Sequence, residues 1–329
     1  MKIKVTVFAA LAAVTMAPLA LASRSHDDAF ARRGQAGDNV MLESAGDSKQ
    51  ERKEPGFFFH HRDKTPSAEQ FAAAGEAYTR GDYSGACSLY DTLVRSWPYS
   101  AEAAEAQSNL AQLFEMRGKY ARAFEEYAYL LEYYPENARV GDILEHMFAI
   151  ANWNLGKGKR ESAIKLFTRL TQIAPGWKGM PETYYCLGLA QLADKNYYEA
   201  ADAFDTLVSS FPESELAPAA ADKHSLALYA LSLKYKEDEA IQKRAIALAV
   251  AALKDGDKDS ADRTVIAANL DDLVTRRDAR AFAIARFYDT RRFKNETRIA
   301  AYEEFLRKCP QAPQAEEARR RLTVLKGGK

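Results

Sequence analysis

Between residues 86 and 212 the chain repeats one spacing of an alanine, an aromatic residue, a leucine and a proline. The aromatic residue follows the alanine by four positions, the leucine follows after three more, and the proline after a further five. The four copies are Ala86, Tyr90, Leu93 and Pro98; Ala123, Tyr127, Leu130 and Pro135; Ala163, Phe167, Leu170 and Pro175; and Ala200, Phe204, Leu207 and Pro212. Offsets of four and three place the first three residues on one face of a helix, and proline cannot continue that helix. The spacing therefore predicts four helices that each end shortly before a proline.

The prolines lie 37, 40 and 37 residues apart, which is near the period of helix-turn-helix repeats. A first helix is expected before each of the four, with a small residue at Ala111, Ala151 and Gly188. We expect each small residue to lie opposite the alanine of the second helix, so that Gly188 packs against Ala200. With turns at 81–83 and 118–120, the pattern resembles the tetratricopeptide signature. It predicts four repeats over residues 67–215.

Beyond residue 216 the pattern loosens. Residues 217–252 are expected to form two helices, a degenerate fifth pair, followed by a polar loop over 254–263 and a long helix from 267 towards 288. The spacing returns in part at Tyr302, Phe305 and Pro310, with Arg298 in the place of the alanine, and a final helix over 312–325 would cap the array. The predicted fold class is all-α: a tetratricopeptide-repeat helical solenoid of about five helix-turn-helix repeats with a capping C-terminal helix. It spans residues 66–325, before a tail at 326–329.

The first 22 residues have the features of a signal peptide. Two lysines precede an apolar run that ends in Ala20-Leu21-Ala22, a small-residue cleavage site, so that Ser23 would follow the cut after Ala22. The alternative is a retained membrane anchor. No cysteine near the cut offers a site for a lipid. We expect an exported protein in the periplasm, associated with the outer membrane at most through its partners.

Residues 23–65 are polar and lack a sustained period, which predicts a disordered linker. Phe57, Phe58 and Phe59 stand out in it, followed by two histidines. The three rings either dock on the first helices of the folded domain or form a short anchor for a partner or a membrane surface. The two histidines alone are a weak signal for a metal.

The charge composition argues against a nucleic-acid partner. Lysine plus arginine and aspartate plus glutamate each number 46, whereas nucleic-acid binders usually carry a basic excess. The three cysteines, Cys87, Cys186 and Cys309, lack metal-ligand spacing, and we expect them to be small buried residues.

Several segments from residue 67 onwards also resemble the BamD family of outer-membrane assembly lipoproteins. They are the start at Ser67-Ala68-Glu69, the helix ends YDTLVRSWPYS and YLLEYYPEN, the run FDTLVSSFPESELAPAAADK, and the C-terminal runs AIARFYDTRRF and AYEEFLRKCPQAPQAEEARRRL. The resemblance covers about residues 66–325 and implies a non-enzymatic periplasmic scaffold that assists assembly of outer-membrane β-barrel proteins. The partners it implies are the periplasmic domains of a BamA-like protein, or unfolded outer-membrane proteins.

Two features depart from that family: no lipidated cysteine follows the signal peptide, and the segment 217–271 is longer than the family pattern. The alternative is a Tol-Pal-associated coordinator of the cell envelope and division (CpoB, also called YbgF), or another periplasmic repeat adaptor. The coiled coil that usually begins the CpoB family is missing here.

The motifs that suggest other chemistry are incomplete. Asp255, Asp257 and Asp259 alternate like a calcium loop, but Ser260 and Ile266 stand where that loop needs glycine and glutamate. The run 156–159 contains glycine and lysine like a phosphate-binding loop, yet it follows no strand. We therefore predict no enzyme activity, no cofactor and no metal.

One basic stretch is a candidate docking surface for an acidic partner domain. Its candidate residues are Arg276, Arg277, Arg280, Arg291, Arg292 and Arg298. The alternative is a solvated helix face with local ion pairs. Charge complementarity would serve specificity and the rate of association more than affinity.

Overall fold

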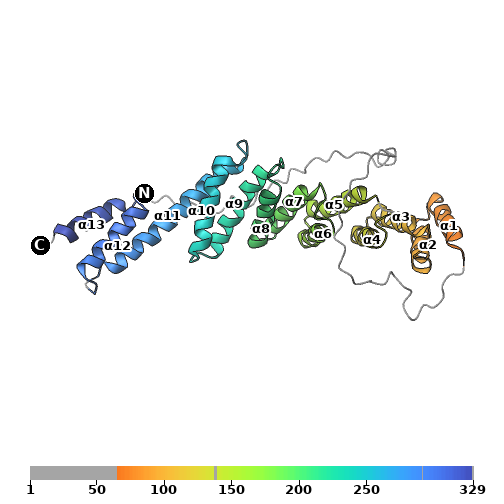
Figure 1. Cartoon of the computed structure of the whole chain (residues 1–329), viewed down its shortest axis with the longest axis horizontal. Coiled ribbons are helices and arrows are strands. Elements are labelled where there is room, and N and C mark those ends of the chain that lie inside the picture. The colour runs from red at the N-terminus through yellow and green to blue at the C-terminus, as the bar shows by residue number, and fades with distance from the viewer. Residues whose placement is uncertain (1–64, 137–138, 291, 328–329) are drawn as a thin grey trace, which may run out of the picture. The chain divides into compact units, whose positions relative to one another are not determined.

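The computed structural model describes residues 65–136, 139–290 and 292–327, and every regular element in these ranges is an α-helix (Figure 1). The helices are α1 (Ser67–Thr79), α2 (Tyr83–Ser96), α3 (Ala103–Met116), α4 (Tyr120–Tyr133), α5 (Val140–Gly156), α6 (Arg160–Ile173), α7 (Met180–Ala193), α8 (Tyr197–Ser210), α9 (Ala217–Lys234), α10 (Glu239–Asp255), α11 (Asp262–Tyr288), α12 (Asn295–Lys308) and α13 (Ala315–Gly327). The predicted all-α fold is confirmed. The chain forms two compact units, the first ending at Cys186 and the second beginning at Leu187.

The first unit consists of successive helix pairs, as the spacing predicted. The alanines that begin the repeated pattern on α2, α4 and α6 are fully buried, and so are the small residues Ala111 and Ala151 on the preceding helices. Within each pair the turn passes through a glycine with a positive φ, at Gly81, Gly118 and Gly158. That backbone region is open to glycine at little cost, so the first helix ends at the same point of each repeat.

The second unit begins with regular pairing and then changes. Helices α8, α9 and α10 pack in sequence, and α11 contacts both α9 and α10. A small core of Ala249, Ala252 and Ile266 joins α10 to α11. The two predicted helices over 217–252 are thus confirmed as α9 and α10.

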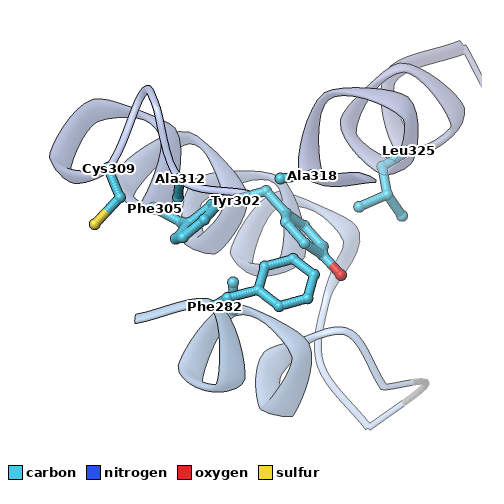
Figure 2. Packing of buried hydrophobic residues seen from close by; sticks show 8 residues of the cluster. Phe282, Tyr302, Phe305, Cys309, Ala312, Ala318 and Leu325 are labelled. Atoms are coloured by element: carbon cyan, nitrogen blue, oxygen red, sulfur yellow. The ribbon is translucent and has the colours of Figure 1, made fainter. Parts of the chain in front are cut away.

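The C-terminal helices close on a core of their own (Figure 2). The ring of Phe282 on α11 lies 6.4 Å from that of Tyr302 and 5.2 Å from that of Phe305, both on α12. Ala318 and Leu325 of α13 complete this cluster. The partial return of the repeat spacing at Tyr302 and Phe305 therefore marks a real buried face, and α13 covers it.

Some predicted boundaries shift. The polar loop expected over 254–263 occupies only the residues between Asp255 and Asp262, and α11 starts at Asp262 instead of 267. The Ser260 hydroxyl accepts a hydrogen bond from the Asp262 amide, and the Lys223 ammonium lies 2.6 Å from the Asp262 carboxylate. These contacts stabilise an earlier helix start. The final helix begins at Ala315 and runs to Gly327, past the predicted end at 325.

The predicted signal peptide, the cut between Ala22 and Ser23, and the linker with Phe57, Phe58 and Phe59 lie outside the described residues. Among the described helices, none is long and apolar enough to cross a membrane. The three cysteines are buried and free, as predicted.

The nearest neighbour of Gly188 is an aromatic ring. A Cβ atom added at Gly188 would lie 2.6 Å from the Phe204 ring of α8, and the three atoms nearest to it all belong to that ring, so Phe204 and not Ala200 limits the space at this position. The aromatic ring of the repeat, one turn beyond the alanine, fills the space that the missing side chain leaves.

We predict that Gly188→Ala lowers the free energy of unfolding by about 1–3 kcal/mol, because the methyl group overpacks against the Phe204 ring. The matched control is Gly75→Ala on α1, where an added Cβ meets nothing within 4 Å. That change should be neutral or stabilise by up to about 1 kcal/mol through helix propensity. Urea unfolding of both variants measures the difference. Equal effects of the two substitutions would contradict the packing at Gly188.

Candidate functional site

The first helices of the four repeats, α1, α3, α5 and α7, contain no lysine or arginine. They carry seven carboxylates: Glu69, Glu76, Glu105, Glu115, Asp142, Glu145 and Glu182. The second helices of the first three pairs do carry arginine or lysine, at Arg95 on α2, Arg122 on α4 and Arg160 on α6. The second helix of the fourth pair, α8, carries Glu199, Asp202 and Asp205 and no lysine or arginine, so the lack of basic residues distinguishes the first helices only in the first three pairs.

Three of these carboxylates occupy the same repeat position. Glu105, Glu145 and Glu182 each lie six residues before the small residue that packs inward, and all three are exposed. Equivalent positions on helices that pack in the same way point in the same direction. We call the outward side that these glutamates define the acidic first-helix face.

Neighbouring first helices contact each other through Glu115. Its carboxylate accepts a hydrogen bond of 2.8 Å from the Tyr127 hydroxyl, and it lies 3.0 Å from Nδ1 of His146 on α5. The hydrogen bond with Glu115 raises the pKa of His146, and burial raises the pKa of Tyr127. Glu115 thus holds α3, α4 and α5 together, while the exposed glutamates remain on the surface.

Polar and aromatic side chains lie beside the exposed carboxylates. Ser108 and Asn109 on α3, and Phe148 and Asn152 on α5, are half-buried. Amide and hydroxyl groups of this kind can bind the backbone of an extended peptide, and the carboxylates can bind its lysine or arginine side chains.

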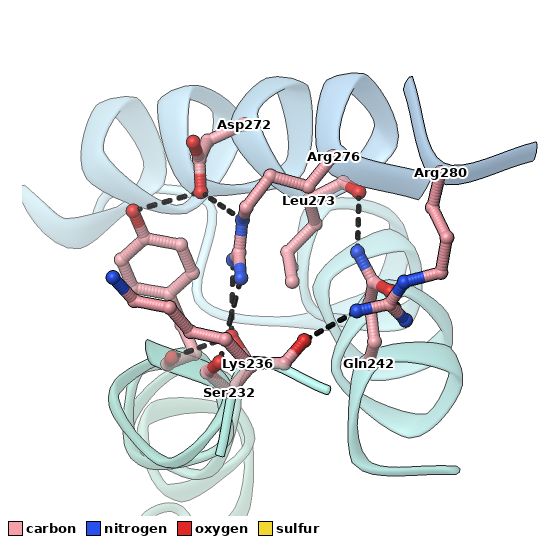
Figure 3. A network of polar contacts seen from close by, with 8 residues as sticks. Ser232, Lys236, Gln242, Asp272, Leu273, Arg276 and Arg280 are labelled. Carbon is pink, nitrogen blue, oxygen red and sulfur yellow. Dashed lines mark hydrogen bonds and ion pairs between the residues drawn. The ribbon is translucent and has the colours of Figure 1, made fainter. Parts of the chain in front are cut away.

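The predicted basic docking residues are mostly bonded within the chain. Figure 3 shows Arg276 and Arg280 of α11 reaching towards the turn between α9 and α10. Arg276 donates to Asp272 at 2.9 Å and to the Ser232 hydroxyl at 3.1 Å. Arg280 donates to Gln242 at 3.1 Å and to the carbonyl of Lys236. These two guanidinium groups join α11 to the preceding helix pair.

Arg277 and Arg298 are also paired. Arg277 donates to Asp278 at 2.8 Å, and Arg298 donates to Asp289 at 2.6 Å. Arg292 is exposed, and Arg291 lies outside the described residues. Most of these arginines therefore make contacts within the chain. A docking role for the basic stretch stays a prediction, and it depends mainly on Arg292.

Asp289 is the meeting point of the C-terminal helices. Its carboxylate accepts hydrogen bonds from Arg298 and Arg321, and a third of 3.0 Å from the Tyr302 hydroxyl. These hydrogen bonds, of which the bond from Arg321 has the largest effect, hold the pKa of Asp289 well below its usual range. Burial acts in the opposite direction and raises this pKa. One nearly buried carboxylate at the end of α11 thus joins α12 and α13.

The motifs that suggested other chemistry have structural roles. Lys157 and Lys159 lie over the Trp153 ring, at 5.8 Å and 4.8 Å from its centroid. The Asp257 carboxylate accepts a hydrogen bond from the Asp259 amide inside its own loop. Within the part of the chain that the structure describes, no group of three or more candidate ligands is placed to hold a metal ion.

Two segments match the tetratricopeptide-repeat family: residues 105–137, which span α3 and α4, and 182–214, which span α7 and α8. A comparison with curated proteins gives no match. With its all-helical architecture, the fold is of the tetratricopeptide-repeat class, a class of protein-interaction scaffolds.

Among solved structures, the chain is similar to the MamA protein, with 17% identity over 57% of this chain and 90% of that one at a TM-score of 0.31. A tetratricopeptide repeat protein from Parabacteroides merdae has 16% identity over 79% of this chain and 98% of that one, with a TM-score of 0.30. YrrB, described as a repeat protein with an unusual peptide-binding site, has 15% identity over 56% and 88% of the two chains, again with a TM-score of 0.30. Likenesses this weak carry no argument about function.

The acidic first-helix face was missed at the sequence level, although a signal was present. Each first helix lacks lysine and arginine, which can be seen in the sequence once the helix pairs are marked. The overall balance of charge hides this local excess of carboxylates.

We predict that Asp289→Asn lowers the free energy of unfolding by about 1–3 kcal/mol near neutral pH, because Arg298 and Arg321 lose an ionised acceptor. The pKa of Asp289 is lower in the folded protein than the ordinary carboxyl pKa of about 4. The stabilisation from its hydrogen bonds is therefore complete above that ordinary value and declines as the pH falls from there through the folded pKa. The difference from the parent should therefore shrink in acid. Urea unfolding at a series of pH values measures it.

Asp271→Asn is the control, because Asp271 is an exposed carboxylate on α11, the helix that Asp289 follows. It should leave stability nearly unchanged at every pH. A cost for Asp289→Asn that is no larger than the cost for this control would show that the carboxylate does not join the helices.

Proposed function

We propose that this chain is a non-enzymatic protein-binding scaffold whose acidic first-helix face binds lysine- or arginine-bearing segments of partner proteins. The observation that carries the proposal is the charge of α1, α3, α5 and α7, which together hold seven carboxylates and no lysine or arginine. The tetratricopeptide-repeat class of the fold supports it.

The proposal depends on which side chains of the first helices are buried and which are exposed. Most of the large apolar residues of the first helices are buried, and the exposed surface of these helices is mainly polar, with Tyr78 on α1 and Met116 on α3 as exposed exceptions. Carboxylates spaced one per repeat attract a basic segment from a distance and fix its register. A partner held in this way binds more weakly as salt screens the charges.

More specifically, we propose that the chain acts in the periplasm as a BamD-like factor in outer-membrane β-barrel assembly. The proposal rests on the signal-peptide features of residues 1–22 and on the C-terminal runs that resemble that family. Its partners would be BamA-like periplasmic domains or unfolded outer-membrane proteins. The exposed Arg292 next to the paired arginines offers a second contact point for an acidic partner domain.

The alternative is a Tol-Pal-associated coordinator or another periplasmic repeat adaptor. The absence of a cysteine near residue 22 favours it, since BamD-like proteins are lipidated there. Both readings share the scaffold role and differ in the partner.

Affinity capture from a cell envelope with the full chain tests both the binding surface and the identity of the partner. Glu105→Lys combined with Glu145→Lys should reduce capture of the partner about tenfold, because two attractive contacts become repulsive. Glu161→Lys combined with Glu199→Lys makes the same charge change on exposed positions of α6 and α8 and should leave capture unchanged.

The identity of the captured protein decides between the finer readings. Recovery of a barrel-assembly component supports the BamD-like proposal, and recovery of Tol-Pal components supports the alternative. If the partner is captured equally by both double variants, the acidic first-helix face is not the binding surface and the proposal fails.

A further inference from the structure

We propose that the aromatic run Phe57–Phe59 docks on its own chain, in a cavity formed by the second helices of the first three repeats. The cavity has a volume of about 290 Å³ and lies between α2, α4 and α6. The residues of its wall that matter here are Arg95, Arg122, Arg169, Glu125, Glu132 and Tyr129. This surface is separate from the acidic first-helix face, so the inference stands apart from the proposed function.

The described chain begins close to this cavity. The carbonyl oxygen of Thr65 accepts a hydrogen bond of 3.1 Å from the indole nitrogen of Trp97, at the end of α2. Arg95, which lines the cavity, lies only two residues before that tryptophan. The chain that precedes Thr65 therefore starts next to Trp97, two residues along the chain from a residue of the cavity wall.

The length of the intervening chain suits the docking. Phe59 precedes Thr65 by six residues and Phe57 by eight, and an extended chain spans about 3.4 Å per residue. The three rings can therefore lie up to roughly 20–27 Å from Thr65. Helices pack about 8–10 Å apart, so this reach covers the neighbouring second helices.

One aromatic side chain belongs to the cavity wall, and two others pack against it. Tyr129 forms part of the wall, and its ring centroid lies 4.3 Å from that of Tyr133 and 6.2 Å from that of Tyr134. The Tyr134 hydroxyl donates to the carbonyl of Pro98 at 2.9 Å, which ties the end of α4 to the turn after α2. Aromatic rings pair favourably with one another, so the part of the wall that Tyr129 forms suits phenylalanine.

The charged groups of the wall fit the rest of the segment. Arg122 already lies over the Phe114 ring, 5.0 Å from its centroid, and the Arg95 guanidinium is held by Asp91 at 2.8 Å. Guanidinium planes positioned in this way can cover further aromatic rings. The exposed carboxylates Glu125 and Glu132 can pair with the basic residues that follow the phenylalanines, His60, His61 and Arg62.

The consequence of docking is a brace across the start of the array. The cavity is lined by residues of three successive repeats. A phenylalanine run bound across α2, α4 and α6 would link these repeats through the chain itself and would leave the acidic first-helix face open to a partner.

Disulfide trapping in the full chain tests the proposal. Phe58→Cys is combined in one variant with Glu132→Cys, at the rim of the cavity, and in a second with Ala101→Cys. Ala101 is exposed and adjoins Glu102, whose side chain bonds to Ser67 at the start of α1, so a free linker would reach it at least as easily. The three native cysteines are buried, and mass spectrometry of peptides identifies each bond.

Docking predicts that the bond to position 132 forms about tenfold faster than the bond to position 101, since the docked segment has the higher local concentration there. Adding Phe57→Ser and Phe59→Ser to the first variant should abolish this preference while circular dichroism stays unchanged. Equal or faster trapping at position 101 overturns the proposal and fits a run that is free for another protein or a lipid surface. A preference that survives the two serine substitutions overturns it as well, because the rings then do not cause it.

Discussion

The close approach of the two helices within each pair is the contact on which the first unit depends. Ala111 and Ala151 on the first helices and Ala123 and Ala163 on the second are fully buried. Small side chains let the helix backbones come near each other, and the space that remains is filled by rings such as Tyr127 and Phe167. Because this packing uses the apolar side of every first helix, the opposite side is left for polar groups. The position of the acidic first-helix face thus follows from how the repeats are held together, whereas its negative charge comes from the particular residues at these positions.

In the second unit, polar contacts between helices take the place of the close packing of small residues. Beyond α10 the regular spacing of small residues is lost, and arginine side chains from α11 donate to groups on the preceding helix pair. At the C-terminal end the carboxylate of Asp289 accepts bonds from two arginines and one tyrosine. Such networks are stable only when each member keeps its partner, so these arginines contribute first to the fold. Their charge is therefore a poor guide to a docking surface.

The sequence predicted the parts of the fold that depend on local periodicity. The alanine, aromatic and leucine positions of all four repeats identified second helices that the structure confirms, and Tyr302 and Phe305 marked the core of the C-terminal cap. It could not predict contacts between residues far apart in the chain. Arg321 lies 32 residues from Asp289, and no spacing rule joins them. The close approach of Phe204 to Gly188 was not predicted for a related reason, since the helix register places both Ala200 and Phe204 near this position and only the packing decides which is nearer.

We propose that carboxylates on the first helices bind the partner, whereas the arginines of α11 stabilise the fold. The most direct test is the dependence of the partner's dissociation constant on salt concentration, measured for the parent chain and for Glu105→Gln combined with Glu145→Gln. The affinity of the parent for the partner should fall as the salt concentration rises, because mobile ions screen the exposed carboxylates. The affinity of the double variant should depend clearly less on salt. An affinity that is insensitive to salt, or a dependence that the two glutamine substitutions leave unchanged, would contradict it.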